Sequence, residues 1–330
     1  MYTTIKKEEL KNLVIKVLTK HGETQENAEI LYDLMYEDEI SGKSSHGFYR
    51  FPGFMQSLNP DNKKDAVEVT VNGNVISVDG KKNIGVIPIK KAVDKIIELS
   101  ETQNIIVAGV NNYENNTGAI GYYARKLAKA GLISIITVSS EACVVPHGGM
   151  DLMLGTNPVA MGFPCGDNPV ITDVTTAAMP WGRIAVLGKA GQPVPDGVIM
   201  DKDGNPSNDP DDLIKRGGKQ LPLAGHKGYA LGVAMEILGG IFVGGKGGKH
   251  AVPGSDAAFI VAMKKDAFIP AEEYEAKMAA FVDEVKNSTK APGVDEIRIP
   301  GMLGPDYFEM AESDEITILT TIYNDILKYA

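Results

Sequence analysis

Apolar residues recur at helical spacing over the first forty positions of the chain. Residues 8–21 carry one apolar stripe, and Gly22 follows where a helix would end. Thr24 is placed to open a second helix with a stripe of its own. The two stripes are Leu10, Leu13, Val14, Val17 and Leu18, then Ala28, Leu31, Leu34 and Met35. The pattern therefore predicts two amphipathic helices before the segment 44–50.

Beyond residue 60 the pattern becomes mixed. Residues 67–71 and 75–78 are rich in β-branched side chains and flank Asn72-Gly73-Asn74, which predicts a β-hairpin. The change of pattern predicts a domain boundary at Asn59-Pro60-Asp61. Later segments predict helices over 89–100 and 118–130, and strands over 105–110, 133–138, 158–163, 170–174 and 259–263. A strand over 316–319 and a last helix are expected near the end of the chain.

Two further stretches have unusual compositions. Residues 183–215 are rich in Gly, Pro, Asp and Asn, which predicts long surface connections. Residues 227–242 are apolar nearly all round, which predicts a buried helix.

Composition and charge exclude several classes of protein. A net charge of -10 argues against sequence-independent binding of nucleic acid. No run approaches the roughly 20 apolar residues of a membrane span, and the N-terminus lacks the apolar core of a secretory signal. Cys143 and Cys165 are too few for a disulfide scaffold, and the five histidines form no H-x-H or H-E-x-x-H motif. We therefore expect a cytoplasmic protein without a metal site.

The segment 44–50 contains the most informative chemistry. His46 can exchange a proton near neutral pH, and the guanidinium of Arg50 can bind a carboxylate with two hydrogen bonds. If the preceding helix continues, the two side chains share one helix face, because they are four residues apart. Each residue alone is more often structural, and Ser45 is equally suited to cap a local turn. Together the pair favours reduction of a 2-oxo acid with the aid of a cofactor.

Other motifs leave alternatives open. No strand is followed by G-x-G-x-x-G, so a Rossmann domain is disfavoured. Asp173 ends an apolar run, where it can accept a hydrogen bond from a ribose or cap a helix. Lys227 begins the apolar helix after Gly225-His226, where a cation opposes the helix dipole. That position predicts an anionic neighbour, either a pyrophosphate or a protein carboxylate.

These motifs, in this order, resemble the type 2 malate/L-lactate dehydrogenase family, a non-Rossmann group that includes ureidoglycolate, sulfolactate and diketogulonate oxidoreductases. The matching segments span nearly the whole chain. They are Ser45-His46-Gly47 with Arg50, Gly121-Tyr122-Tyr123-Ala124, Val144-Val145-Pro146 with Gly148-Gly149, Gly155-Thr156-Asn157-Pro158, Asp173-Val174-Thr175, Gly225-His226-Lys227-Gly228-Tyr229 and Ile299-Pro300-Gly301.

The resemblance implies an α+β fold with two domains and a homodimer whose active sites lie where subunits meet. Residues 1–60 plus 290–330 would form a helical catalytic and dimerisation domain. Residues 61–289 would form an inserted, non-Rossmann dinucleotide-binding domain built on a mostly antiparallel sheet.

The resemblance also implies the roles of individual residues. The histidine of the S-H-G motif donates a proton to the substrate oxygen, and the arginine four residues later binds the substrate carboxylate. These roles would fall on His46, next to Ser45, and on Arg50. The contacts to NAD, or alternatively NADP, would fall on Ser140, Thr156, Asn157, Asp173, Val174, Thr175, His226, Lys227 and Gly301.

Two positions depart from the family pattern. Asn116 stands where many members have a second histidine, and an amide can orient a carbonyl but cannot shuttle a proton. Met302 replaces the glutamate of a P-G-E motif, which removes one expected carboxylate.

We therefore predict an NAD(P)-dependent oxidoreductase that acts at C2 of a small 2-oxo or 2-hydroxy acid. His46 would act as general acid and base, and Arg50 would hold the C1 carboxylate. Asn116 would hydrogen-bond the reacting oxygen or a second group of the substrate. The first alternative is a reductase of a cyclic imine carboxylate that uses the same site. The second is a non-catalytic dinucleotide-binding protein.

Overall fold

A computed structural model describes residues 1–58, 64–114 and 116–330 of the protein. The predicted boundary at Asn59-Pro60-Asp61 lies outside the described residues. The fold is mixed, and its main sheet is mostly antiparallel, as the sequence predicted.

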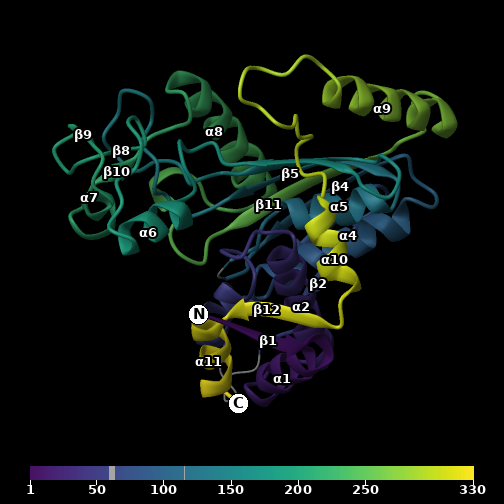
Figure 1. Cartoon of the computed structure of the whole chain (residues 1–330), viewed down its shortest axis with the longest axis horizontal. Helices are drawn as coiled ribbons and strands as arrows, with labels where there is room; N and C mark the ends of the chain where they lie inside the picture. Colours follow the sequence, from purple (N-terminus) through teal and green to yellow (C-terminus); the bar gives the residue numbers. More distant parts are fainter. Residues whose placement is uncertain (59–63, 115) are drawn as a thin grey trace.

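The two ends of the chain lie side by side (Figure 1). Strand β1 (Tyr2–Lys6) pairs antiparallel with β12 (Glu315–Leu319), and α11 (Thr320–Lys328) follows. The two predicted helices are α1 (Lys7–Lys20) and α2 (Gln25–Ile40), and the Thr24 side chain caps α2 by accepting a hydrogen bond from the Asn27 amide. A short α3 (Phe51–Ser57) packs against α11. Strand β1 was not predicted, since its partner β12 is more than 300 residues away in the sequence.

The main sheet has seven strands in the order β2-β3-β4-β11-β5-β6-β7. Only β3 and β4 run parallel, and every other neighbouring pair is antiparallel. The strands are β2 (Glu68–Asn72), β3 (Val75–Asp79), β4 (Ile105–Asn111), β5 (Leu132–Ser139), β6 (Val159–Phe163), β7 (Val170–Val174) and β11 (Ala257–Lys264). All seven were predicted from the sequence within a few residues.

Helices lie on both faces of this sheet (Figure 1). One face carries α4 (Val86–Leu99) and α5 (Gly121–Lys129), and the other carries α8 (His226–Gly239) and α9 (Ala271–Lys286). Helix α10 (Pro305–Glu312) contacts α2. None of the helices in the described ranges is both long and apolar enough to cross a lipid bilayer.

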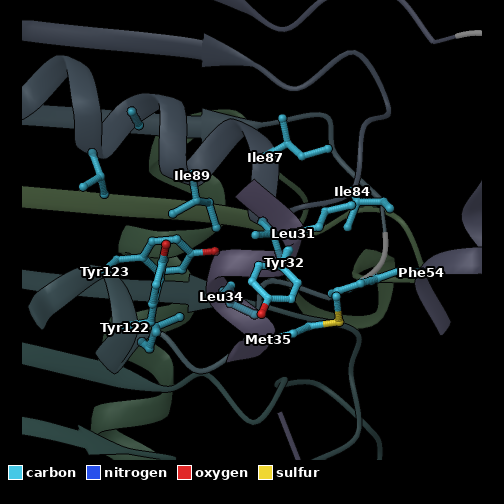
Figure 2. Packing of buried hydrophobic residues seen from close by; sticks show 14 of the residues in the cluster. Leu31, Tyr32, Leu34, Met35, Phe54, Ile84, Ile87, Ile89, Tyr122 and Tyr123 are labelled. Carbon is cyan, nitrogen blue, oxygen red and sulfur yellow. The ribbon is translucent and has the colours of Figure 1, made fainter. Parts of the chain in front are cut away.

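One hydrophobic core joins the N-terminal helices to the sheet. Leu31 and Leu34 of α2 pack among Ile89 of α4 and Tyr122 and Tyr123 of α5 (Figure 2). All five side chains are buried. Each side chain of this size contributes roughly 1.5–3 kcal/mol by leaving water, so α2 is held firmly where it leads into the segment 44–50.

The prediction of long surface connections over residues 183–215 was wrong. This region contains α6 (Trp181–Lys189), α7 (Pro210–Lys215) and a three-stranded sheet of β8 (Ile199–Met200), β9 (Pro206–Ser207) and β10 (Lys219–Gln220). Ile184, Val194, Val198 and Ile199 form a small core of its own. These apolar residues are too far apart in the sequence to produce a periodic signal.

The prediction of a buried helix over residues 227–242 was also wrong. Helix α8 ends at Gly239 and is followed by the short 3₁₀ helix η2 (Ile241–Val243). Its buried positions include Gly228, Gly232 and Gly239, and a Cβ atom on Gly239 would lie 3.0 Å from the backbone nitrogen of Ser139 in β5. Two of its larger apolar residues point away, because Leu231 is 50% exposed and Ile237 is 48% exposed. A third 3₁₀ helix, η3 (Gly248–His250), follows.

Candidate active site

The segment 44–50 leaves the axis of α2, so the prediction that His46 and Arg50 share a helix face was wrong. Helix α2 ends at Ile40, His46 lies in a turn, and Arg50 ends the 3₁₀ helix η1 (Phe48–Arg50). Gly47 allows this path, since a Cβ atom there would lie 2.3 Å from Oε2 of Glu39. The same Glu39 oxygen accepts a hydrogen bond from the Phe48 amide at 3.1 Å, which ties the turn back onto α2.

The turn nevertheless brings His46 and Arg50 to one cavity of about 1370 Å³. Eight predicted site residues line this cavity, and they come from five separate parts of the fold. They are Ser45, His46, Arg50, Asn116, Ser140, Thr156, Asp173 and Thr175. The tertiary structure therefore assembles most of the predicted site.

His46 is set up to be neutral near pH 7. Its pKa is lowered from 6.5 to about 4. Burial is the largest cause of this shift, and the neighbouring Arg50 charge is the second. Nδ1 of His46 lies 3.1 Å from Oγ of Ser45, which leaves Nε2 as the ring nitrogen for a ligand. The predicted role of Ser45 thus becomes that of orienting the imidazole.

Arg50 presents an unpaired buried donor. Its Nε is buried without a hydrogen-bond partner in the part of the chain that the structure describes. Burial lowers the pKa of the guanidinium, which still remains charged. A buried, charged donor without a partner is costly, so an anion in this cavity would be bound favourably.

Asp173 holds two parts of the cavity wall together. Its Oδ2 accepts hydrogen bonds from Nζ of Lys43 at 2.7 Å and from the Gly121 amide at 3.1 Å. Gly121 begins α5, so the carboxylate stabilises that helix N-terminus. Lys43 was missed by the sequence analysis, because a single lysine after a glycine has no motif.

Asp38 is a second residue that sequence reasoning missed. It is only 2% exposed on α2, and its Oδ2 accepts a hydrogen bond from the Ala119 amide at 3.3 Å. Burial raises the pKa of this carboxyl to about 7 despite the Lys43 charge. No signal in the sequence indicated this burial, because the position of Asp38 in the helical pattern suggested only the polar edge of α2.

Asn116 lies beside the cavity in a loop that it helps to hold. Its side-chain oxygen accepts a hydrogen bond from the Gly118 amide. Gly118 has a φ of +72°, and a Cβ atom there would lie 2.4 Å from Cδ1 of Leu34. The loop is therefore built for glycine at this position and for a short amide at residue 116.

Hydrogen bonds hold Thr156, Asn157 and Thr175 in place, in two separate sets. The Thr175 hydroxyl donates to the Thr156 carbonyl at 2.8 Å. Asn157 is fully buried and does not line the cavity, and its amide nitrogen donates to Oε2 of Glu236 on α8 at 2.6 Å. Asn157 therefore connects the cavity wall to α8.

Four other predicted cofactor residues lie outside the cavity lining. Val174 is exposed, and His226 and Lys227 begin α8, where the His226 ring lies 6.1 Å from that of His147. None of the ion pairs within the described ranges includes Lys227. Gly301 has a φ of +65°, and its carbonyl accepts a hydrogen bond from Nη2 of Arg125 at 2.7 Å.

Comparison with known proteins decides the family. The profile described as "Malate/L-lactate dehydrogenase" matches residues 5–327 of the chain. The protein belongs to this family. A malate dehydrogenase of Pyrococcus abyssi is 31% identical, with 92% of this chain and 87% of that protein covered.

Other similar proteins are named for different activities. A solved structure of sulfolactate dehydrogenase from Methanocaldococcus jannaschii matches with a TM-score of 0.85 and 28% identity, covering 99% of this chain and 96% of that one. A Delta(1)-pyrroline-2-carboxylate/Delta(1)-piperideine-2-carboxylate reductase of Pseudomonas putida is 30% identical, with 72% of this chain and 70% of that protein covered. The predicted membership of the malate/L-lactate dehydrogenase family and the prediction of a hydroxy-acid oxidoreductase are therefore confirmed, and a nicotinamide dinucleotide is the implied cofactor.

Proposed function

We propose that this enzyme interconverts a small 2-oxo acid and its 2-hydroxy acid with NAD, with His46 and Arg50 as the groups that act on the substrate. The observation that carries the proposal is the unpaired buried Nε of Arg50 in the same cavity as a neutral His46. A carboxylate bound at Arg50 would satisfy that donor. It would also bring C2 of the substrate near the imidazole.

The cavity fits a dinucleotide together with a small acid. Ligand sites for a single small molecule usually have volumes of about 300–1,000 Å³, and this cavity has about 1370 Å³. Ser140, Thr156, Asp173 and Thr175 supply hydroxyl and carboxylate oxygens on its wall. We propose these four as cofactor contacts. Val174, His226, Lys227 and Gly301 would contribute only if the cofactor extends beyond the cavity.

In the proposed mechanism His46 and Arg50 act on the substrate, and Ser45 and Asn116 orient the reacting groups. A nicotinamide would, when bound, supply or accept the hydride at C2. In oxidation, neutral His46 removes the hydroxyl proton through Nε2, while Ser45 holds Nδ1. In reduction, the substrate carboxylate neutralises the Arg50 charge and so raises the pKa of His46, which allows it to carry the proton that it donates to the carbonyl oxygen. Asn116 would orient that oxygen.

Substitution of each residue tests this proposal. His46→Ala should lower turnover by about two to four orders of magnitude, because proton transfer is lost. Arg50→Lys should chiefly raise KM, because a point charge replaces a planar fork. Steady-state rates with oxaloacetate and pyruvate, together with thermal unfolding to show that both variants fold, provide the measurement. Unchanged turnover in His46→Ala would contradict the assignment.

Reduction of a cyclic imine carboxylate is a second candidate, favoured by the low pKa of His46. A protonated imine brings its own proton, so it does not need an acid that is almost fully deprotonated at pH 7. The Pseudomonas putida relative is named for this activity. An assay of oxaloacetate, pyruvate and Delta(1)-piperideine-2-carboxylate side by side distinguishes the two candidates by their kcat/KM values.

We propose NAD rather than NADP as the cofactor, because carboxylates line the cavity. Glu141 and Asp256 both line the cavity. The pKa of Asp256 is raised to about 7, mainly by burial and secondly by the negative charge of Glu141. Carboxylates accept hydrogen bonds from a ribose but repel a 2′-phosphate. Comparison of kcat/KM for NADH and NADPH tests this preference.

We also propose a homodimer that covers the exposed apolar side of α8 and η2. Leu231 and Ile237 are about half exposed, and Ile241 and Phe242 are 57% and 68% exposed. Several large apolar side chains exposed on neighbouring elements are typical of an interface between subunits. Light scattering should find a dimer for the native protein and for Val71→Glu, which alters an exposed edge strand, but a monomer for Phe242→Asp. A native monomer would contradict the proposal.

The two-domain arrangement and the cytoplasmic location also remain proposals. In support of a unit made from residues 1–60 and 290–330, the Lys7 ammonium donates to the carbonyls of Met310 at 2.6 Å and Ala311 at 2.9 Å. The hydroxyl of Tyr307 donates to the Glu37 carboxylate at 3.1 Å. Both cysteines are free thiols, which suits a reducing compartment.

A further inference from the structure

Arg183 is a second guanidinium in the cavity that holds His46 and Arg50. It belongs to the first turn of α6, and Pro180, Trp181, Gly182 and Val186 from the same segment also line the cavity. The opposite side of α6 is anchored by Ile184, which is fully buried in a small core. Packing of α6 therefore determines which of its residues face the cavity.

Arg183 lies within reach of the substrate position at Arg50. A Cβ atom built on Gly182 would lie 3.9 Å from Nη2 of Arg50. The Cα of Arg183 is one peptide unit further, about 3.8 Å from the Cα of Gly182, which is short compared with an arginine side chain. At its other end, α6 contacts the residue before Arg50, because Nζ of Lys189 lies 3.2 Å from the Tyr49 hydroxyl.

No group of the described protein neutralises Arg183. It forms no ion pair and no side-chain hydrogen bond within residues 1–58, 64–114 and 116–330. The Arg183 side chain is exposed to water, and two features of its position favour an anion beside it. It stands in the first turn of α6, where a cation opposes the helix dipole, and it faces a cavity that already contains the Arg50 charge. An anion between the two guanidinium groups would remove both penalties.

We propose that Arg183 binds a second anionic group of the substrate and so selects acids with two anions over monocarboxylates. The proposal rests on the proposed function, in which Arg50 holds the C1 carboxylate. A carboxylate or a sulfonate at the far end of a three- or four-carbon acid has the required chemistry, since both accept hydrogen bonds from a planar fork. Arg183 thereby becomes a residue that determines specificity.

Kinetics with three acids test the proposal. Oxaloacetate and 3-sulfopyruvate carry a second anion, whereas pyruvate does not, and the first two distinguish a carboxylate from a sulfonate. Arg183→Gln should lower kcat/KM for the preferred two-anion acid by about 10- to 100-fold, the range expected when a charged hydrogen bond is lost. Its kcat/KM for pyruvate should change by less than about threefold. Arg183→Lys should recover part of the loss, because it keeps the charge.

Lys215→Gln is the matched control. It removes one positive charge from α7, which packs against α6, but Lys215 does not line the cavity and pairs with Asp211. This variant should keep the native preference among the three acids. Equal losses for oxaloacetate and pyruvate in Arg183→Gln would overturn the proposal, as would a raised KM for the cofactor with an unchanged KM for the acids.

A binding measurement separates this inference from the proposed function. Calorimetric titration of malate and lactate into the enzyme needs no hydride transfer. Malate should bind the native enzyme more tightly than lactate, and Arg183→Gln should abolish the difference. If no acid is reduced but this pattern holds, the proposed reaction fails while the role of Arg183 stands. Equal affinities of the native enzyme for malate and lactate would refute that role.

Discussion

In the free enzyme His46 should titrate near pH 4, and it should titrate at higher pH once a carboxylate occupies Arg50. Burial is the larger cause of the lowered pKa and the Arg50 charge is the next. A change from 6.5 to about 4 corresponds to about 3.4 kcal/mol, at 1.36 kcal/mol per unit. At pH 7 only about one molecule in a thousand therefore carries the proton.

This pKa predicts different pH dependences for the two directions of the reaction. Oxidation uses neutral His46, so its kcat/KM should be constant between pH 8 and about pH 5. Reduction uses the protonated form, so its kcat/KM should fall about tenfold for each pH unit between 5 and 8. The folded state also favours neutral His46. Its contribution to stability is therefore present above pH 6.5 and is lost as the pH falls towards 4.

Histidine NMR measures the pKa directly. The chain has five histidines, and the signal that disappears in His46→Gln identifies the one in the cavity. Arg50→Gln should raise the pKa of His46 but leave it below 6.5, because burial remains. Saturating oxamate, an unreactive carboxylate that resembles pyruvate, should raise the pKa of His46 in the native enzyme and have little effect in Arg50→Gln.

A free-enzyme pKa of 6.5 or higher would show that burial and Arg50 do not act on His46 as the structure indicates. So would a reductive kcat/KM that has already reached its plateau at about pH 6.5 and rises no further as the pH falls to 5. An oxamate effect of equal size in the native enzyme and Arg50→Gln would refute the coupling alone.

Two further predictions concern stability. The pKa of Asp38 is raised to about 7, so the protonated form stabilises the fold below pH 3.8 and this contribution is lost as the pH rises through 7. Asp38→Asn should therefore increase the free energy of unfolding at pH 8 by up to about 4 kcal/mol and change it little near pH 4, as measured by urea unfolding. Gly118→Ala should destabilise the protein by about 1–3 kcal/mol, because φ is +72° and the new methyl group meets Leu34. An unchanged melting temperature for Gly118→Ala would contradict the conformation of that loop.

Periodic segments of the sequence predicted most of the fold. The stripes of α1 and α2, the Asn72-Gly73-Asn74 hairpin and the β-branched strands of the main sheet all follow local rules that the structure obeys. Errors occurred where local patterns depend on distant partners. Strand β1 exists only because it pairs with β12, and the core around Ile184 joins residues without periodicity. The apolar pattern of residues 227–242 predicted a buried helix, but Leu231 and Ile237 of α8 are exposed.

The sequence by itself determined the family and the chemical types of the candidate site residues. The spacing of four residues between His46 and Arg50 can be read from the sequence. Although α2 ends at Ile40, the following turn still places both side chains in one cavity. Only the tertiary structure decided how these groups behave. The low pKa of His46, the unpaired Nε of Arg50 and the nearness of Arg183 depend on burial and on charges brought from distant segments. Burial and Coulomb interactions depend on which groups are close together in the folded protein, so they cannot be read from the order of residues along the chain.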